Sequence, residues 1–203
     1  MLIVVLTIVL LAAFLLPKLG GSRRSKRVMC LGNLKQVGLG FQMWTVDHGD
    51  KFPWLVSTNE GGSMEYANST DVFRHFLVTS NELSSPKILV CSADQSRIRW
   101  SAFDQRFGNR NLSYFIGLDA NEMLPQAVLS GDRSISTNGQ IMSGLLTLAN
   151  SSPVRWAKGL HAEGGNVALG DGSVQQMSDV TLRRWVDTST CGRRCEIGEN
   201  RAV

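Results

Sequence analysis

Two absences mark the N-terminal part of the chain. Residues 2–16 (LIVVLTIVLLAAFLL) carry no charge, and no acidic residue precedes Asp47. A cleaved signal peptide has basic residues before its apolar run, whereas here only Met1 precedes the run and the basic residues follow it. This order argues against a signal peptide. A run without charge indicates a membrane anchor, because a helix that is apolar all round is unusual in a small soluble domain.

The apolar run is short for a membrane span. A helix rises about 1.5 Å per residue, so residues 2–16 would reach about 22 Å, against a hydrocarbon core of about 30 Å. Pro17 ends the run. We expect residues 1–17 to form a transmembrane or filament-core helix segment that contacts the lipid bilayer. Its candidate assembly residues are Leu2, Leu6, Leu10, Phe14 and Pro17.

Acidic residues are also missing from the basic stretch 18–27, which holds five of the 21 lysines and arginines. Residues 28–203 then carry 16 basic and 17 acidic residues, so the formal charge of +4 comes from the basic stretch and not from the folded part. A juxtamembrane stretch of this kind suits anionic lipid headgroups, and no nucleic-acid partner is expected. By the positive-inside rule alone, these charges would keep the rest of the chain in the cytoplasm.

Beyond the basic stretch, the sequence predicts an amphipathic helix. Apolar residues recur at spacings of three and four up to the breaker residues His48 and Gly49, which is the period of one helix face. We expect one helix, bent or loosened around residues 17–22, to continue from the membrane into the domain, where a sheet covers its apolar face. That face consists of Val28, Leu31, Leu34, Val37, Phe41 and Trp44.

No internal repeat or low-complexity tract occurs in the rest of the chain, and its apolar segments are short. They predict a short helix within residues 69–83, capped by Ser69 or Thr70, and several strands. The expected fold class is α+β. A long N-terminal helix, membrane-embedded in its first half and amphipathic in its second, packs on the mainly antiparallel β-sheet of a globular head formed by residues 28–203. The expected strands are residues 87–91, 112–118, 126–131 and 152–161.

The stretch HAEGGNVALGDGS, residues 161–173, combines a histidine, a glutamate and an aspartate with several glycines. Asp171-Gly172 is a strong signal for a two-residue type I′ turn, in which both residues take positive φ. The sequence therefore predicts a β-hairpin in which residues 165–170 pair with residues 173–177.

The predicted hairpin should contribute to the core. We expect Val167, Leu169 and Val174 to share its inner face, because alternate residues of a strand point the same way. A short helix over residues 178–186 follows, with Ser178 as its N-cap. Its inward residues are Leu182, Trp185 and Val186.

Several motifs resemble those of one bacterial family. An apolar run ending in LLP and a basic stretch precede CLGNLKQVGLGFQMW, residues 30–44, and LVCSAD follows at residues 89–94. The spacing His161-x9-Asp171-Gly172 comes near the C-terminus. Together these motifs resemble type IV pilin-like proteins and type II secretion pseudopilins, in the subgroup with a C-terminal H-x9-DG motif. The resemblance implies a structural filament subunit whose partners are other pilin-like subunits and the inner-membrane assembly machinery.

The chain departs from that family at its start. Such precursors carry a short basic leader, a glycine before the cleavage point, and then a phenylalanine and a glutamate, none of which is present here. If Pro17 is matched to the family's proline, Met1 falls just after the expected glutamate, and we expect Met1 to be an internal methionine. The added residues would lengthen the apolar run to about twenty, enough for a span. The resemblance implies a single pass of the bacterial inner membrane, with the head in the periplasm or on the cell surface.

His161 and Asp171 are residue types of a catalytic pair, but the predicted strand separates them. Nine extended residues span about 30 Å at about 3.3 Å each, which is a poor geometry for a dyad unless Gly164 and Gly165 fold the chain back. We predict no catalytic residue, no enzyme activity and no cofactor, with His161 bonded to a backbone carbonyl at a sheet edge. A membrane-anchored hydrolase that uses His161 and Asp171 is the weaker alternative.

The sequence lacks the spacing of an EF-hand, and neither His48 nor His75 has a partner pattern typical of zinc sites. Calcium stays open as an alternative, because it binds six to eight oxygen ligands. Candidate ligands are Asp119, Glu122 and Asp132, together with residues 47–50.

Cysteine is scarce, and its four residues permit three disulfide pairings. Cys191 and Cys195 could close a small loop outside the cytoplasm, or form half of a zinc site for which Cys30 is a poor partner. Cys30 and Cys91 both lie in the family-like motifs, so the resemblance allows a bond between them without deciding it.

A binding module is the alternative function. In that case the head of a surface-displayed minor pilin would capture a polysaccharide, DNA or a secreted substrate. The aromatic residues expected on its surface are Trp54, Tyr66, Trp100 and Trp156.

Overall fold

The computed structural model describes residues 3–6, 23–121, 123–148, 152–158, 160–161, 164–188 and 194–198. Its α+β class, with antiparallel sheets, confirms the expectation from the sequence. The helices are α2 (Arg23–Val46), α3 (Phe73–Val78), α4 (Ser80–Leu83) and α5 (Asp179–Thr188). The strands are β1 (Tyr114–Gly117), β2 (Val128–Asp132), β3 (Ile135–Thr137), β4 (Gln140–Ile141), β5 (Gly144–Thr147), β6 (Val154–Trp156), β7 (Gly164–Leu169), β8 (Val174–Ser178) and β9 (Arg194–Ile197).

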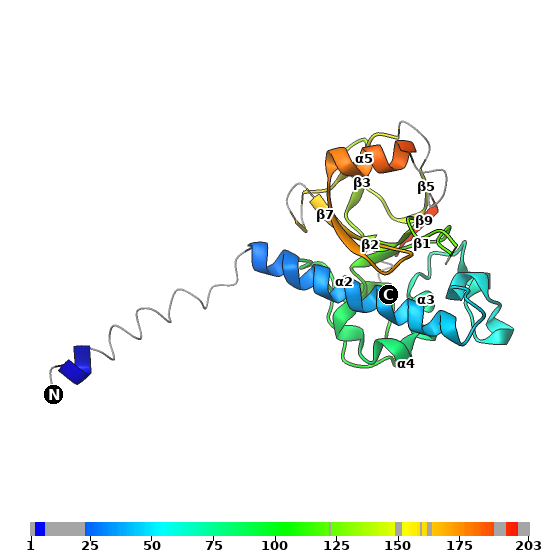
Figure 1. Ribbon diagram of the computed structural model, residues 1–203, viewed down its shortest axis with the longest axis horizontal. Coiled ribbons are helices and arrows are strands. Elements are labelled where there is room, and N and C mark those ends of the chain that lie inside the picture. The colour runs from blue at the N-terminus through cyan, green and yellow to red at the C-terminus, as the bar shows by residue number, and fades with distance from the viewer. Residues whose placement is uncertain are drawn as a thin grey trace.

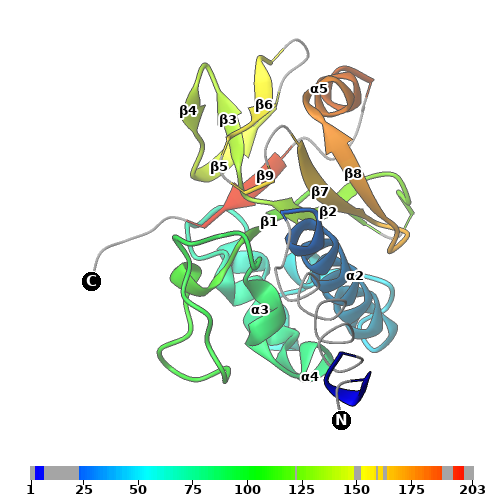
Figure 2. The same ribbon diagram turned by 90° about the vertical axis from the view of Figure 1, so that its left-hand side faces the viewer.

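A six-stranded antiparallel sheet forms the central layer, in the order β5-β9-β1-β2-β7-β8. Every residue of β1, β2 and β7 is buried, so both faces of this sheet are covered. Figure 2 shows α2, α3 and α4 on one side, and α5 with a second sheet, β4-β3-β6, on the other. The head is therefore a three-layer arrangement around one shared sheet.

Helix α2 packs along β7, β2 and β8 (Figure 1). The predicted residues Leu34, Val37 and Phe41 are fully buried, but Val28 is 57% exposed and Cys30 occupies the inward position. At 100° per residue, Val28 lies half a turn away from Val37. Val28 therefore points away from the sheet.

The aromatic side chains beneath α2 close the core on the helix side. Phe41 packs against Trp54 and Phe76, with ring centroids 5.4 and 5.5 Å apart. Because Trp54 follows α2 by only a short turn, the chain doubles back over the C-terminal half of the helix. The segment that follows α2 therefore contributes side chains to the hydrophobic core.

The other face of the central sheet has its own core. It is formed by residues from β1, β2 and β7 together with the second sheet and α5. Leu182 and Val186 of α5 are buried there, as predicted, and Trp185 packs against them at the edge. The hydroxyl of Ser178 accepts a hydrogen bond from the Thr181 N–H at 3.3 Å, which confirms the predicted cap.

The predicted hairpin exists as β7 and β8, but its turn is not type I′. Gly172 alone of the Asp171-Gly172 pair has positive φ, at 77°. The Gly172 N–H donates to the Leu169 carbonyl at 2.9 Å, and the Leu169 N–H donates to the Ser173 carbonyl at 2.9 Å. The connection therefore has three residues, with the left-handed position last.

This longer turn changes the pairing register. Ala168 lies opposite Val174, so Leu169 and Val174 fall on opposite faces. Leu169 and Val167 belong to the core on the α5 side, whereas Val174 packs on the α2 side. The prediction that all three share one face was wrong, because one added residue moves a strand's side chains to the other face.

Strands β1 and β6 lie within the predicted residues 112–118 and 152–161, and β2 overlaps the predicted 126–131 but extends to Asp132, whereas residues 87–91 do not form a strand. Pro86–Leu89 is a 3-10 turn, in which the Ser85 hydroxyl accepts from the Lys87 N–H at 3.4 Å. Proline fixes a φ that suits the first helical position, and serine caps it. These two residues outweigh the strand propensity of the apolar run.

The short helix predicted within residues 69–83 is present as α3 and α4, but its cap was wrong. Val72 occupies the N-cap of α3 and its side chain makes no cap hydrogen bond, whereas Asn109 Oδ1 accepts from the Phe73 N–H at 3.1 Å. The Ser69 hydroxyl instead accepts from the Asp71 N–H at 3.0 Å, inside the preceding turn.

The predicted anchor falls mostly outside the described residues. Residues 3–6, which include Leu6, are helical, whereas Leu2, Leu10, Phe14 and Pro17 lie outside the described ranges. Within those ranges, no helix combines the length and the apolar character that a membrane crossing requires. Helix α2 begins at Arg23, so the second half of the basic stretch belongs to the same helix as the head residues.

Candidate functional site

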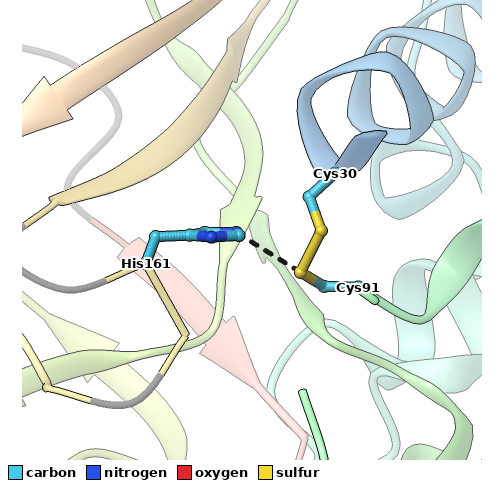
Figure 3. Close-up of side chains that lie close together, drawn as sticks. All are labelled: Cys30, Cys91 and His161. Atoms are coloured by element: carbon cyan, nitrogen blue, oxygen red, sulfur yellow. Dashed lines mark hydrogen bonds between the residues drawn. A yellow bond between two sulfur atoms is a disulfide. The ribbon is translucent and has the colours of Figure 1, made fainter. Parts of the chain in front are cut away.

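A cysteine pair and a histidine meet where four segments of the head converge. Cys30 comes from the inward face of α2, Cys91 follows the Pro86–Leu89 turn, and His161 precedes β7. Figure 3 shows the imidazole of His161 pointing at the sulfur atoms of the cysteine pair. Asp132, the last residue of β2, lies beside the imidazole.

Cys30 and Cys91 form a disulfide that joins α2 to a segment 61 residues later. Both residues are buried, with 0% and 1% exposure. The pairing that the resemblance allowed is therefore present. Cys195 falls within β9 and Cys191 lies outside the described residues, so a bond between those two stays a prediction.

The His161 ring is held inside the head. Its Nε2 lies 3.3 Å from Cys91 Sγ and 3.6 Å from Asp132 Oδ2. The prediction of a backbone carbonyl partner at a sheet edge was wrong for this nitrogen. The segment before β7 turns the ring toward the disulfide, which is a contact over 70 residues of sequence.

Burial controls the protonation of both partners. It raises the pKa of Asp132 to about 7, although the Asn166 N–H bond at 2.7 Å and the Arg27 charge oppose the rise. Burial also lowers the pKa of His161 to about 4, and Arg27 adds to this effect. Both shifts favour the uncharged form, because charge is costly away from water.

Arg27 of α2 lies over the start of β7. A methyl group at Gly164 would come within 2.5 Å of Arg27 Nη2, so the guanidinium occupies space that only glycine leaves free. The basic stretch of the sequence thus reaches the buried Asp132–His161 pair electrostatically. Asp132 Oδ1 has no hydrogen-bond partner within the described part of the chain.

A second polar cluster fixes the segment that carries Cys91. The carboxylate of Asp94 accepts from Arg133 Nε at 2.8 Å, from Arg133 Nη2 at 3.0 Å and from Ser113 Oγ at 2.9 Å. Burial alone would raise the pKa of Asp94, but the hydrogen bonds and the charge of Arg133 hold the pKa below its ordinary value. This bidentate ion pair ties the turn after Cys91 to the residue that follows β2.

The two halves of the H-x9-DG motif lie at opposite ends of β7, as the sequence predicts. His161 belongs to the buried cluster. Asp171 lies in the exposed turn, where its Oδ1 accepts from the Ser173 N–H at 2.8 Å, and Gly172 supplies the positive φ. Each half therefore has its own structural role.

Two of the three calcium candidates lie near opposite ends of β1, since Asp132 pairs with Tyr114 and Asp119 follows Gly117. Asp132 is completely buried beside His161, and Glu122 lies outside the described residues. Asp119 accepts from Arg194 Nε at 2.6 Å and from the Arg194 N–H at 2.9 Å. One of these carboxylates is thus bound by an arginine and the other is enclosed, and the calcium alternative stays a prediction.

Within the described residues, the group with metal-ligand spacing is the cysteine pair with His161, whose ligand atoms all lie within 4.8 Å of one another. Reasoning from the sequence missed this cluster, because its members are far apart along the chain. His48 and His75 lie elsewhere, with Nδ1 atoms 2.8 Å from the Trp44 carbonyl and 2.8 Å from the Ser63 hydroxyl respectively.

The aromatic surface expected for a binding module is only partly exposed. Trp54 and Trp156 are buried, with 2% and 3% exposure, because each fills a core. Tyr66 and Trp100 are half-buried, and each is covered by an arginine guanidinium 4.8 Å from the ring centroid. Two of the four residues are therefore unavailable to a ligand.

Comparison of the chain with protein-family models, with curated proteins and with solved structures found no match. The family resemblance thus rests on the motifs of the sequence.

Proposed function

We propose that this chain is a non-catalytic structural subunit of a type IV pilus-like or type II secretion pseudopilus-like assembly. Its N-terminal helix segment, residues 1–17, holds it in the bacterial inner membrane before assembly, with the head in the periplasm or on the cell surface. The observation that carries the proposal is α2, which begins within the basic stretch and packs along the central sheet as part of the head. This is the arrangement that the resemblance implies.

A second face of α2 supports an assembly role. It carries exposed apolar side chains that lie within about 60° of one another around the helix, opposite the buried face. An exposed apolar stripe of this kind is typical of interaction surfaces. These residues and their exposures are Val28 57%, Leu39 55%, Met43 51% and Val46 75%.

The disulfide supports a location outside the cytoplasm. Disulfides persist in oxidising compartments such as the periplasm and the cell surface, and are rare where thiols are kept reduced. Cys30–Cys91 bonds the long helix to the head, so its formation follows export of the head.

Photo-crosslinking in living bacteria tests the assembly role. A photo-reactive amino acid replaces Leu39 in the full-length chain, and the matched control replaces Val180, which is 63% exposed on α5. We expect a ladder of crosslinked products from position 39, a monomer from position 180, and loss of the ladder when residues 1–17 are deleted.

A monomer from position 39 in cells that carry the chain in their membranes would contradict the proposal. Equal ladders from both positions would also contradict it, since they would indicate aggregation rather than a specific contact along α2.

A further inference from the structure

The Cys30–Cys91 disulfide, which links α2 to the rest of the head, is surrounded by further side chains of the types that bind metal ions. The two sulfur atoms and His161 Nε2 lie within 4.8 Å of one another. The carboxylate of Asp132 lies 3.6 Å from the same nitrogen, and its Oδ1 has no hydrogen-bond partner within the described part of the chain. Asp132 is completely buried, so this oxygen is a second, independent sign of an unused ligand.

We propose that the dithiol form of Cys30 and Cys91 binds one zinc ion together with His161 Nε2, and that Asp132 occupies the fourth position. The disulfide and the zinc ion are then alternative links between α2 and the segment that carries Cys91. In the reduced chain the metal fixes α2 to the head, and oxidation replaces the metal by the covalent bond.

The observed geometry is close to what zinc requires. With bonds of about 2.3 Å to sulfur and about 2.0–2.1 Å to nitrogen, tetrahedral ligands lie about 3.5 Å apart for a sulfur–nitrogen pair and about 3.8 Å apart for two sulfurs. Cys91 Sγ and His161 Nε2 are already 3.3 Å apart. Zinc binding needs two changes. The sulfurs must separate, which rotation about the cysteine side-chain bonds supplies, and the Asp132 carboxylate, which lies outside the group of ligand atoms within 4.8 Å of one another, must move toward the sulfurs.

The charges also fit. Two thiolates and one carboxylate with a divalent cation leave a net charge of −1. Arg27 lies at the start of β7 and acts electrostatically on both Asp132 and His161, so it offsets this charge.

The chemistry balances with a dithiol as reductant. The reductant transfers two electrons and two protons to the Cys30–Cys91 bond, giving two thiols and the disulfide of the reductant. Zinc then displaces both thiol protons into solvent, because thiolates are the ligands. A disulfide carrier reverses the sequence by withdrawing two electrons, which forms the Cys30–Cys91 bond again and releases the ion.

Cobalt titration of the full chain in mild detergent tests the proposal. Cys191→Ser and Cys195→Ser remove the other two cysteines, the protein is reduced anaerobically, the reductant is removed, and Co²⁺ is added. We expect one equivalent to bind with tetrahedral d–d bands and sulfur-to-cobalt charge-transfer absorption, and Zn²⁺ to displace it. The oxidised form of the same protein should show neither signal.

Variants separate the proposed ligands from the rest of the chain. His161→Gln should weaken Co²⁺ binding at least about tenfold, and Cys30→Ser should remove most of the charge-transfer intensity. His48→Gln is the matched control, since His48 contacts Trp44 outside the cluster, and it should bind Co²⁺ as the parent does.

Circular dichroism covers the case in which reduction unfolds the head. Zinc should then restore the folded spectrum of the reduced parent but not that of His161→Gln. A folded, reduced parent that gives no cobalt–sulfur signal would overturn the proposal. Equal binding by the parent and His161→Gln, or an unfolded reduced chain that zinc fails to refold, would overturn it as well.

Discussion

The two faces of the central sheet are built differently. One is covered by the single long helix α2, which the Cys30–Cys91 bond attaches to the head. The other is covered by a small sheet and the short helix α5, and within the described residues it has no covalent link of this kind. The reinforced face is the one whose helix leads toward the N-terminus. In the proposed assembly, force transmitted through the N-terminal helix would reach the head along this face.

The polar contacts of the covering elements also differ between the two faces of the central sheet. The Gln42 side chain of α2 donates to the Gly170 carbonyl in the hairpin at 3.1 Å, and the Tyr114 hydroxyl donates to the Cys30 carbonyl at 3.4 Å. On the other face, the Asp179 side chain accepts from the Trp156 N–H at 2.8 Å. Helix α2 is therefore fixed at both ends of its buried face.

The largest effect of a point substitution is expected on the α2 face. Phe41→Ala removes a fully buried ring that contacts Trp54 and Phe76. We expect the free energy of unfolding to fall by about 3–5 kcal/mol, the range for deleting a buried aromatic side chain. Urea denaturation of the oxidised head measures it.

Leu39→Ala is the matched control, because Leu39 lies on the opposite side of the same helix and is 55% exposed. Its effect should stay within about 0.5 kcal/mol. Equal losses from both substitutions would mean that α2 has no single buried face.

Loss of the disulfide should come next. Cys30→Ser with Cys91→Ser opens a link of 61 residues, which is expected to lower the free energy of unfolding by about 2–5 kcal/mol. Hydrogen exchange should quicken in α2 more than in α5, because the bond holds only α2. Equal acceleration in the two helices would contradict the difference between the faces.

Local patterns in the sequence predicted the elements but not their pairing. The three-and-four spacing identified α2, and Asp171-Gly172 identified the hairpin. The register was wrong, because a three-residue turn differs from a two-residue turn in geometry rather than in its residues. Strands β3, β4, β5 and β9 were missed, because each has only two to four residues and because β5 and β9 pair with each other from distant parts of the chain.

The candidate site was harder to predict than the fold. His161 was noticed because of its motif, and Cys30 and Cys91 because of the resemblance. Their meeting depends on three long-range contacts, over 61 and 70 residues and from the end of β2. Asp132 carried a calcium prediction because a sequence shows a carboxylate but not its burial.

The hairpin turn offers a smaller test that compares the two faces. Gly172→Val imposes positive φ on a β-branched residue and brings its Cβ within 2.5 Å of the Gln42 side chain on α2. We expect a loss of about 1–3 kcal/mol in thermal or urea unfolding. Gly139→Val, with φ of 81° and open space in the second sheet, carries the strain alone and should cost less. The reverse order would show that the Gln42 contact contributes nothing.

The smallest net effect concerns pH. The pKa of Asp132 is about 7 in the folded chain against a reference of 3.8, so the folded state binds more protons between these values and stability falls as pH rises. The pKa of His161 is about 4 against 6.5, so the unfolded state binds more protons and stability rises with pH. Between pH 4 and 6.5 the two contributions oppose each other in the wild type.

Single substitutions separate the pH dependence of stability that Asp132 contributes from the one that His161 contributes. Relative to wild type, the stability of Asp132→Asn should increase as pH rises from about 4 to 7, and that of His161→Gln should decrease as pH rises from about 4 to 6.5. Chemical denaturation at several pH values gives both curves. Identical pH dependence in all three proteins would mean that the pair does not titrate as its burial indicates.

The proposed assembly requires α2 to be a structural part of the head. Truncation tests it directly, by comparing residues 23–203 with residues 47–203 in solubility and urea unfolding. The shorter chain lacks four large buried side chains worth about 1.5–3 kcal/mol each, which together rival the net stability of a typical domain, about 5–15 kcal/mol. These are Leu34, Val37, Phe41 and Trp44. We predict that residues 23–203 unfold cooperatively and that residues 47–203 aggregate, whereas equal solubility and stability of the two chains would contradict the account.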